Sequence, residues 1–249
     1  MAETGWVINL ADSPDRMESA RAELGRGGFA VARVDACDGR GRALNDFEGY
    51  DDAMARRFMG RSLTPGELGC HESHMRALAA FLDGGDAAAL VLEDDFRFTE
   101  GGAEAAKAVI AWMRQNPRWH AVNVGASKRK ITTPLAGLAG RELVRAHYFP
   151  MLAHAMVWSR AGAEALLARR HPVFCPAANM YRHVLTRSGR GLALYPPAAA
   201  ADAFDSDITA RSGGQRGKRG RTALYGWRRQ KRLWTEKLVA LRHQRAARA

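Results

Sequence analysis

The feature that most constrains the fold of this chain is an apolar run that ends in three consecutive acidic residues, Glu93-Asp94-Asp95. The run, residues 87–92, is apolar at every position, which predicts a short strand buried on both faces of a sheet. In open α/β sheets, ligands bind beyond the carboxyl ends of the strands. Mg²⁺ and Mn²⁺ take oxygen ligands and bridge to phosphate groups. The pattern is therefore typical of a metal–diphosphate site, and the alternative is a solvated acidic turn.

The segments before this run predict an α/β fold. Residues 6–10 and 30–34 are β-prone, and between them Ser13-Pro14 is a typical helix start, with Gly27-Gly28 as its stop. A strand–helix–strand opening is the building unit of a parallel sheet. Residues 39–62 carry no periodic pattern, and we expect a long loop there.

A second helix start follows that loop. Thr64 and Glu67 have the spacing of a capping box, which predicts a helix that runs to about Asp83. Cys70 and His74 on this helix have the spacing of two zinc ligands, but the sequence shows no second cysteine–histidine pair, and structural zinc sites normally have four ligands. We therefore expect His74 to lie at a contact between this helix and the sheet rather than to bind zinc.

The positive charge of the chain belongs to its C-terminal tail. Residues 211–249 hold 13 Lys or Arg and one acidic residue, whereas residues 1–210 hold 25 of each sign, so the net charge of +12 says nothing about the ligand of the body. This distribution argues against a nucleic-acid-binding protein. Between Leu224 and Arg245 the apolar residues lie on one helical face among arginines, which is typical of a helix at an anionic membrane surface. The alternative is that this face packs on the body or on a second subunit.

Several of these motifs, in this order, resemble glycosyltransferase family 25. The ordered set spans residues 6–208, although each motif alone is weak. The motifs are Val7–Leu10, Ser13–Arg16, Asp38-Gly39, Leu63–Cys70 with Ser73-His74, Leu90–Asp95, Ser159–Ala163, Tyr195–Pro197 and Asp205–Ile208.

The resemblance implies a GT-A-like α/β fold over residues 1–210, with a mostly parallel central sheet flanked by helices and a basic amphipathic tail at 211–249. It implies inverting, metal-dependent transfer of a sugar from a nucleotide sugar such as UDP-galactose to a glycan or lipid-linked saccharide, in lipopolysaccharide or lipooligosaccharide biosynthesis. The three cysteines, an odd number at wide spacing, favour a reducing compartment. We expect a cytoplasmic protein that binds the inner face of the membrane through residues 212–249.

The resemblance also assigns roles to particular residues. Mn²⁺ or Mg²⁺ would be held by Asp95 and Asp94. The nucleotide-sugar donor would contact five residues, which are Asn9, Arg16, His74, Glu93 and Asp94.

The chain departs from the family pattern at two places. Members often carry Pro-x-Asp where this chain has Pro176-Ala177-Ala178, and His71-Glu72 replaces the usual apolar pair. An inverting transferase needs a general base near the acceptor hydroxyl. Glu72 and Asp207 are the substitutes that the sequence offers, with Asp205 as a further acid. The alternative is a weak or inactive member that binds a nucleotide sugar or a protein partner.

Overall fold

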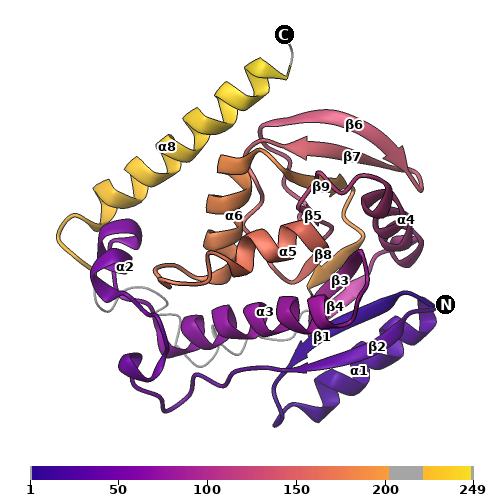
Figure 1. Cartoon of the computed structure of the whole chain (residues 1–249), viewed down its shortest axis with the longest axis horizontal. Helices are drawn as coiled ribbons and strands as arrows, with labels where there is room; N and C mark the ends of the chain where they lie inside the picture. Colours follow the sequence, from indigo (N-terminus) through magenta and orange to yellow (C-terminus); the bar gives the residue numbers. More distant parts are fainter. Residues whose placement is uncertain (1, 202–220, 248–249) are drawn as a thin grey trace.

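The computed structural model of the chain describes residues 2–201 and 221–247. Its centre is an eight-stranded sheet in the order β2-β1-β3-β8-β5-β9-β7-β6 (Figure 1). A separate two-stranded antiparallel sheet pairs β4 with β10. The strands are β1 Thr4–Asn9, β2 Ala30–Asp35, β3 Ala88–Glu93, β4 Phe96–Phe98, β5 Ala121–Asn123, β6 Thr132–Leu138, β7 Arg141–Ala146, β8 Ala155–Ser159, β9 Gly191–Tyr195 and β10 Ala199–Ala201.

Most strands of the large sheet point the same way. β8 is antiparallel to both of its neighbours, β3 and β5, and β7 is antiparallel to β9 and β6. The other neighbouring pairs are parallel, so only β7 and β8 run against the rest. The expected fold class, an α/β fold with a mostly parallel central sheet flanked by helices, is confirmed.

Helices cover both faces of the sheet. Helices α1 (Pro14–Arg26) and α4 (Gly102–Gln115) share one hydrophobic cluster with Leu90 and Leu92 of β3. The other cluster joins Ala89 and Val91 of β3 to α3, α5 and α6. The apolar run is therefore buried on both faces, as predicted. The helices of the second cluster are α3 Pro65–Asp83, α5 Arg160–Leu167 and α6 Ala177–Ser188.

Local capping chemistry explains where two of these helices begin. The hydroxyl of Thr64 accepts the amide N–H of Glu67 at 3.2 Å, and the Glu67 carboxylate accepts the N–H of Thr64 at 2.9 Å, which confirms the capping box. Ser159 caps α5 by accepting the N–H of Gly162 at 3.0 Å. Ser13 precedes α1 as predicted, but its side chain makes no capping hydrogen bond.

The expected loop over residues 39–62 is wrong in part, because it contains the helix α2, Asp52–Met59. The Asp51 carboxylate caps this helix by accepting the N–H of Met54 at 2.8 Å, and Gly60 ends it with φ of 80°. Only Ala55 and Met59 of α2 are buried. The charged residues around them hide the helical pattern in the sequence.

The β6–β7 hairpin also lacks an obvious signal in the sequence. Its turn places Ala139 and Gly140 at positive φ, 47° and 73°, which a two-residue type I′ turn requires. Alanine rarely takes that conformation, and Pro134 lies at an irregularity of β6, so neither the turn nor the strand follows the usual composition.

The tail forms the predicted helix, α8, over Tyr225–Ala246. It packs on α2 and α6, where the Arg232 guanidinium donates to the carbonyl of Phe58 at 3.0 Å and Glu236 is buried. Most of the predicted apolar face points away from the body: Trp234 is 55% exposed and Leu238 is 54% exposed. The alternative that this face packs on the body is therefore wrong. Within the described ranges, no helix is both long and apolar enough to cross a bilayer.

Candidate functional site

The acidic triplet lies where β3 ends, beside the end of β1. Ile8 of β1 pairs with Glu93 of β3, so Asn9, the last residue of β1, lies next to the turn that follows β3. The Asn9 amide donates to a carboxylate oxygen of Asp94 at 2.7 Å and to the carbonyl of Ser13 at 3.0 Å. The structure thus brings Asn9 and the triplet together at a strand end, the location expected for a ligand site.

Asp94 is held from two sides. Asn9 occupies one carboxylate oxygen, and the Arg16 guanidinium, from the first turns of α1, donates to the other. Burial raises the pKa of Asp94, while the contacts with Asn9 and Arg16 oppose that rise. Both oxygens are engaged by the protein, so Asp94 is better suited to positioning the turn and Arg16 than to serving as a metal ligand.

Asp95 has the opposite character. Its Oδ1 atom is buried and has no hydrogen-bond partner among residues 2–201 and 221–247, and its Oδ2 atom lies 3.9 Å from Arg16. Burial and the negative charges of Glu93 and Asp94 raise the pKa of Asp95 to about 6. A divalent cation would satisfy the unpaired oxygen and offset the accumulated charge. Asp95 therefore fits the role of the metal ligand, and substrate phosphates commonly supply other ligands of such ions.

Glu93 turns toward α3. Its carboxylate lies 3.2 Å from Nε2 of His74, and the His74 ring makes an edge contact with Tyr181 of α6 at 5.5 Å. Burial raises the pKa of Glu93, but the hydrogen bond and charge of His74, with His154 and Arg16 nearby, outweigh it and leave the pKa lowered. Glu93 is thus expected to be an anion, which can accept a hydrogen bond from a hydroxyl group of a ligand. His74 lies at the helix–sheet contact that the sequence analysis favoured.

Cys70, His74 and Glu93 offer ligand atoms that all lie within 4.8 Å of one another. The sequence indicated the first two, and the fold supplies the third from β3. No fourth histidine, cysteine or acid joins them among residues 2–201 and 221–247, so the group lacks the four ligands of a structural zinc site.

The two candidate bases are not part of this cluster in the described structure. The Glu72 carboxylate accepts hydrogen bonds from Arg76 and from the Cys37 thiol. Burial raises the pKa of Glu72, but these contacts outweigh it and lower the pKa, which does not favour a base. Asp207 lies outside the described residues, as does Asp205.

His154, which no sequence motif indicates, also borders the acidic site. Its carbonyl accepts the N–H of Glu93 at 2.9 Å, and its Nε2 atom is buried with no hydrogen-bond partner in the described part of the chain. The ring packs so closely on Gly125 that a Cβ there would lie 2.3 Å from Nε2. Burial lowers the pKa of His154, so a neutral ring is expected there.

The Gly125-Ala126 loop after β5 is an ordinary turn rather than a phosphate cradle. The Asn123 side chain accepts the N–H of Gly125 at 3.1 Å and that of Ala126 at 2.8 Å. These donors are already satisfied. At the start of α6, Ala178 offers no carboxylate where the family often has one.

Comparison with known proteins places the chain in a family. Residues 2–121 match the model of glycosyltransferase family 25 (LPS biosynthesis protein). Over these residues the chain belongs to glycosyltransferase family 25, which confirms the resemblance noted in the sequence.

Individual relatives show the same relationship. The inactive glycosyltransferase 25 family member 3 of Homo sapiens is 31% identical over 174 residues, which are 66% of this chain and 28% of the relative. Procollagen galactosyltransferase 1 of Danio rerio is 28% identical over 138 residues, 52% of this chain and 22% of the relative. The chain thus spans less than a third of the length of these relatives. A solved glycosyltransferase involved in the glycosylation of the major capsid of PBCV-1 superposes with a TM-score of 0.41 at 10% identity, covering 87% of this chain and 100% of that one.

Proposed function

We propose that this protein is a metal-dependent glycosyltransferase that moves a sugar from a UDP-sugar, UDP-galactose or a similar donor, to a saccharide acceptor of lipopolysaccharide or lipooligosaccharide. The observation that supports this most directly is Asp95, a partly buried carboxylate whose buried Oδ1 atom has no partner among the described residues, at a strand end of a family 25 chain. Asp94 is fixed beside it by Asn9 and Arg16.

The chain's own residues divide the work around the donor. Asp95 would hold Mn²⁺ or Mg²⁺, which when bound supplies Lewis acid chemistry to the diphosphate leaving group. Arg16 would add positive charge beside the phosphates, while its bond to Asp94 keeps it oriented. Glu93, held as an anion by His74, would accept a hydroxyl of the donor. An inverting reaction also needs a base at the acceptor, for which Asp207 and Asp205 are the remaining candidates of the sequence.

A screen of UDP-sugars by thermal shift, with and without Mn²⁺, tests the binding step. A donor that binds only the folded protein raises the melting temperature in proportion to the logarithm of its concentration over its dissociation constant. We expect one UDP-sugar to stabilise the protein more strongly with Mn²⁺ than with EDTA. An equal response in EDTA would contradict the metal-dependent site.

A second candidate function is a non-catalytic family member that binds a nucleotide sugar or a protein partner. Two observations favour it, Ala178 where the family often has an acid and the inactive relatives. Hydrolysis of the donor with Mn²⁺ present separates the two: an active transferase releases UDP slowly without an acceptor, whereas a binding protein shows the thermal shift alone.

We further propose that α8 holds the protein on an anionic membrane surface at the cytoplasmic face. Trp234, Leu238 and Leu241 are exposed on one side of a helix rich in arginine and lysine. Exposed tryptophan and leucine beside basic residues fit the interface of a bilayer with anionic lipids. Such an anchor would keep the acidic site near a lipid-linked acceptor.

A further inference from the structure

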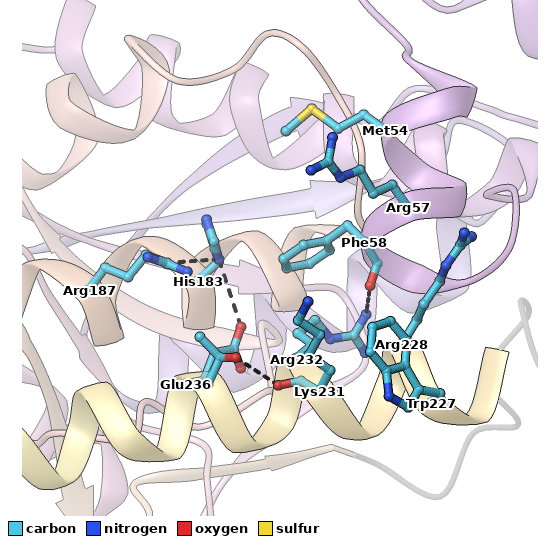
Figure 2. Close-up of a pocket in the computed structure, with 11 residues that line it drawn as sticks. Met54, Arg57, Phe58, His183, Arg187, Trp227, Arg228, Lys231, Arg232 and Glu236 are labelled. Atoms are coloured by element: carbon cyan, nitrogen blue, oxygen red, sulfur yellow. Dashed lines mark hydrogen bonds and ion pairs between the residues drawn. The ribbon is translucent and has the colours of Figure 1, made fainter. Parts of the chain in front are cut away.

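A cavity of about 410 Å³ lies between α2, α6 and α8, and it shares no lining residue with the acidic site at the end of β3. Its walls come from three segments that are distant in the sequence (Figure 2). The cavity therefore exists only because α8 packs on the body of the protein.

The lining is strongly positive. It holds five cations and a single carboxylate, that of Glu236, which is 3% exposed and lies 3.8 Å from Nδ1 of His183. In the described part of the chain, none of the five cations has a carboxylate within salt-bridge distance. Like charges gathered in a concave site repel one another and attract an anion. The five are Arg57, Arg187, Arg228, Lys231 and Arg232.

Two of these cations are fixed in place by the backbone of α2. Arg228 donates to the carbonyl of Arg56 at 2.7 Å, and Arg232 donates to the carbonyl of Phe58 at 3.0 Å. A guanidinium has five N–H donors, so both side chains keep donors for a ligand. Arg57 and Arg187, by contrast, are exposed at the edge of the cavity.

Aromatic rings lie among the charges. Phe58 is held by edge contacts with Phe174 at 5.0 Å and with His183 at 5.1 Å, and Trp227 is 59% exposed. Such rings offer an apolar surface to a sugar or an acyl chain next to a charged group.

We propose that this cavity binds a phosphate-bearing ligand, supplied either by a phosphorylated saccharide or by the headgroup of an anionic lipid. Arginine forks match phosphate oxygens with paired hydrogen bonds, and arginines make up four of the five cations. The ligand class differs from the metal-bridged donor of the acidic site, because here the protein itself supplies the positive charge.

The test uses the full chain in EDTA, so that its outcome does not depend on the metal site or on the proposed transferase activity. Sodium pyrophosphate should raise the melting temperature by several degrees over sodium chloride at equal ionic strength. The double variant Arg57→Gln/Arg187→Gln should lose most of this shift. The matched control Arg229→Gln/Arg242→Gln removes the same charge from exposed positions of α8 that do not line the cavity, and it should keep the shift.

Calorimetry with pyrophosphate and sedimentation with vesicles complete the test. One binding site per chain is expected, and it should weaken at least tenfold in the cavity variant. Binding to phosphatidic acid vesicles that pyrophosphate inhibits, and that the cavity variant loses, would identify a lipid headgroup. Pyrophosphate binding without such inhibition would identify a soluble phosphosaccharide. A pyrophosphate response no larger than that of chloride, or equal in both double variants, would overturn the proposal.

Discussion

Asn9 and Asp94 are 85 residues apart in the chain, yet the amide of Asn9 donates to the carboxylate of Asp94 at 2.7 Å. This bond joins the end of β1 to the turn after β3, and Arg16 completes it from α1. Both carboxylate oxygens of Asp94 are therefore hydrogen-bonded within the protein. Of the two aspartates, only Asp95 has a buried oxygen with no partner among the described residues. The two neighbouring aspartates should therefore respond differently to substitution.

Asp95→Asn should abolish the Mn²⁺-dependent thermal shift with the donor and lower donor hydrolysis by at least a hundredfold, while the fold persists. The amide keeps the shape of the carboxylate but loses the charge that a divalent ion requires. The control is Asp83→Asn, the same change at an exposed position near the end of α3. Full activity in both Asp95→Asn and Asp94→Asn would show that the metal site is elsewhere.

Asp95→Asn should also stabilise the metal-free protein at neutral pH. The folded pKa of about 6 lies above the ordinary value of 3.8, so the folded state binds the proton more tightly than the unfolded state. The protonated Asp95 carboxyl therefore favours the folded state below pH 4, and this contribution to the free energy of unfolding is lost as the pH rises through 6. Each unit of pKa shift corresponds to about 1.4 kcal/mol. We expect the variant to gain about 2–3 kcal/mol at pH 7.5 in urea unfolding with EDTA, and little at pH 4. An equal gain at both pH values would contradict this ionisation.

Local signals account for the part of the fold that the sequence predicts well. The apolar run of β3 and the capping box of Thr64 and Glu67 both lie within a few consecutive residues, so the strand and the helix start that they predict do not depend on distant parts of the chain. Helix α2 was missed because its buried side is only Ala55 and Met59, and its packing depends on α8, far along the chain. The tail helix was predicted, but the side that it turns to the body was not.

The candidate site shows the same limit. The strand end with its acids could be predicted from a short apolar run, and the family resemblance named Asn9 and Arg16. Which of the two aspartates forms an ion pair could not be predicted, because the pairing depends on a contact between Arg16 and Asp94, which are 78 residues apart in the chain. The approach of Glu93 to Cys70 and His74 likewise arises from packing of α3 on the sheet.

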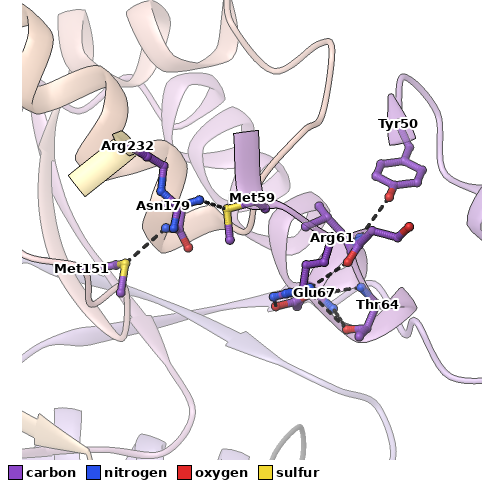
Figure 3. A network of polar contacts seen from close by, with 10 residues as sticks. Tyr50, Met59, Arg61, Thr64, Glu67, Met151, Asn179 and Arg232 are labelled. Carbon is purple, nitrogen blue, oxygen red and sulfur yellow. Dashed lines mark hydrogen bonds and ion pairs between the residues drawn. The ribbon is translucent and has the colours of Figure 1, made fainter. Parts of the chain in front are cut away.

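Thr64→Ala should lower the free energy of unfolding by about 1 kcal/mol, because the hydroxyl caps α3 (Figure 3). Ser13→Ala is the matched control: Ser13 also precedes a proline at a helix start, but its side chain makes no capping bond. It should change stability by less than about 0.5 kcal/mol. Chemical unfolding of both variants measures the difference, and similar losses would contradict the observed cap geometry.

His71→Leu should reduce the amount by which the free energy of unfolding falls between pH 7 and pH 4. Burial, with the nearby His74, lowers the pKa of His71 to about 4, from 6.5. As the pH falls from 6.5 to 4, His71 binds a proton in the unfolded chain but not in the folded chain, so the free energy of unfolding decreases over this range. The contribution is about 3 kcal/mol in total. Urea unfolding from pH 7 to pH 4 should show a smaller decline in the variant, and parallel curves would exclude His71 as a source.

The exposed face of α8 provides the test of membrane binding. Deletion of residues 212–249 would remove Glu236 and Ala240, which are buried against the body, so loss of binding in that variant could reflect unfolding.

Trp234→Ser/Leu238→Ser/Leu241→Ser changes only exposed side chains, at 55%, 54% and 39% exposure, and leaves the cavity lining intact. We expect an unchanged melting temperature and unchanged hydrolysis of a soluble donor. Binding to vesicles with anionic lipid should fall at least tenfold at low salt, since the apolar contacts supply the insertion and the basic residues the attraction. Sedimentation with vesicles measures this. Retained binding would indicate attraction by charge alone, and a dimer that the substitutions dissociate would show that the face instead contacts a second copy of the chain.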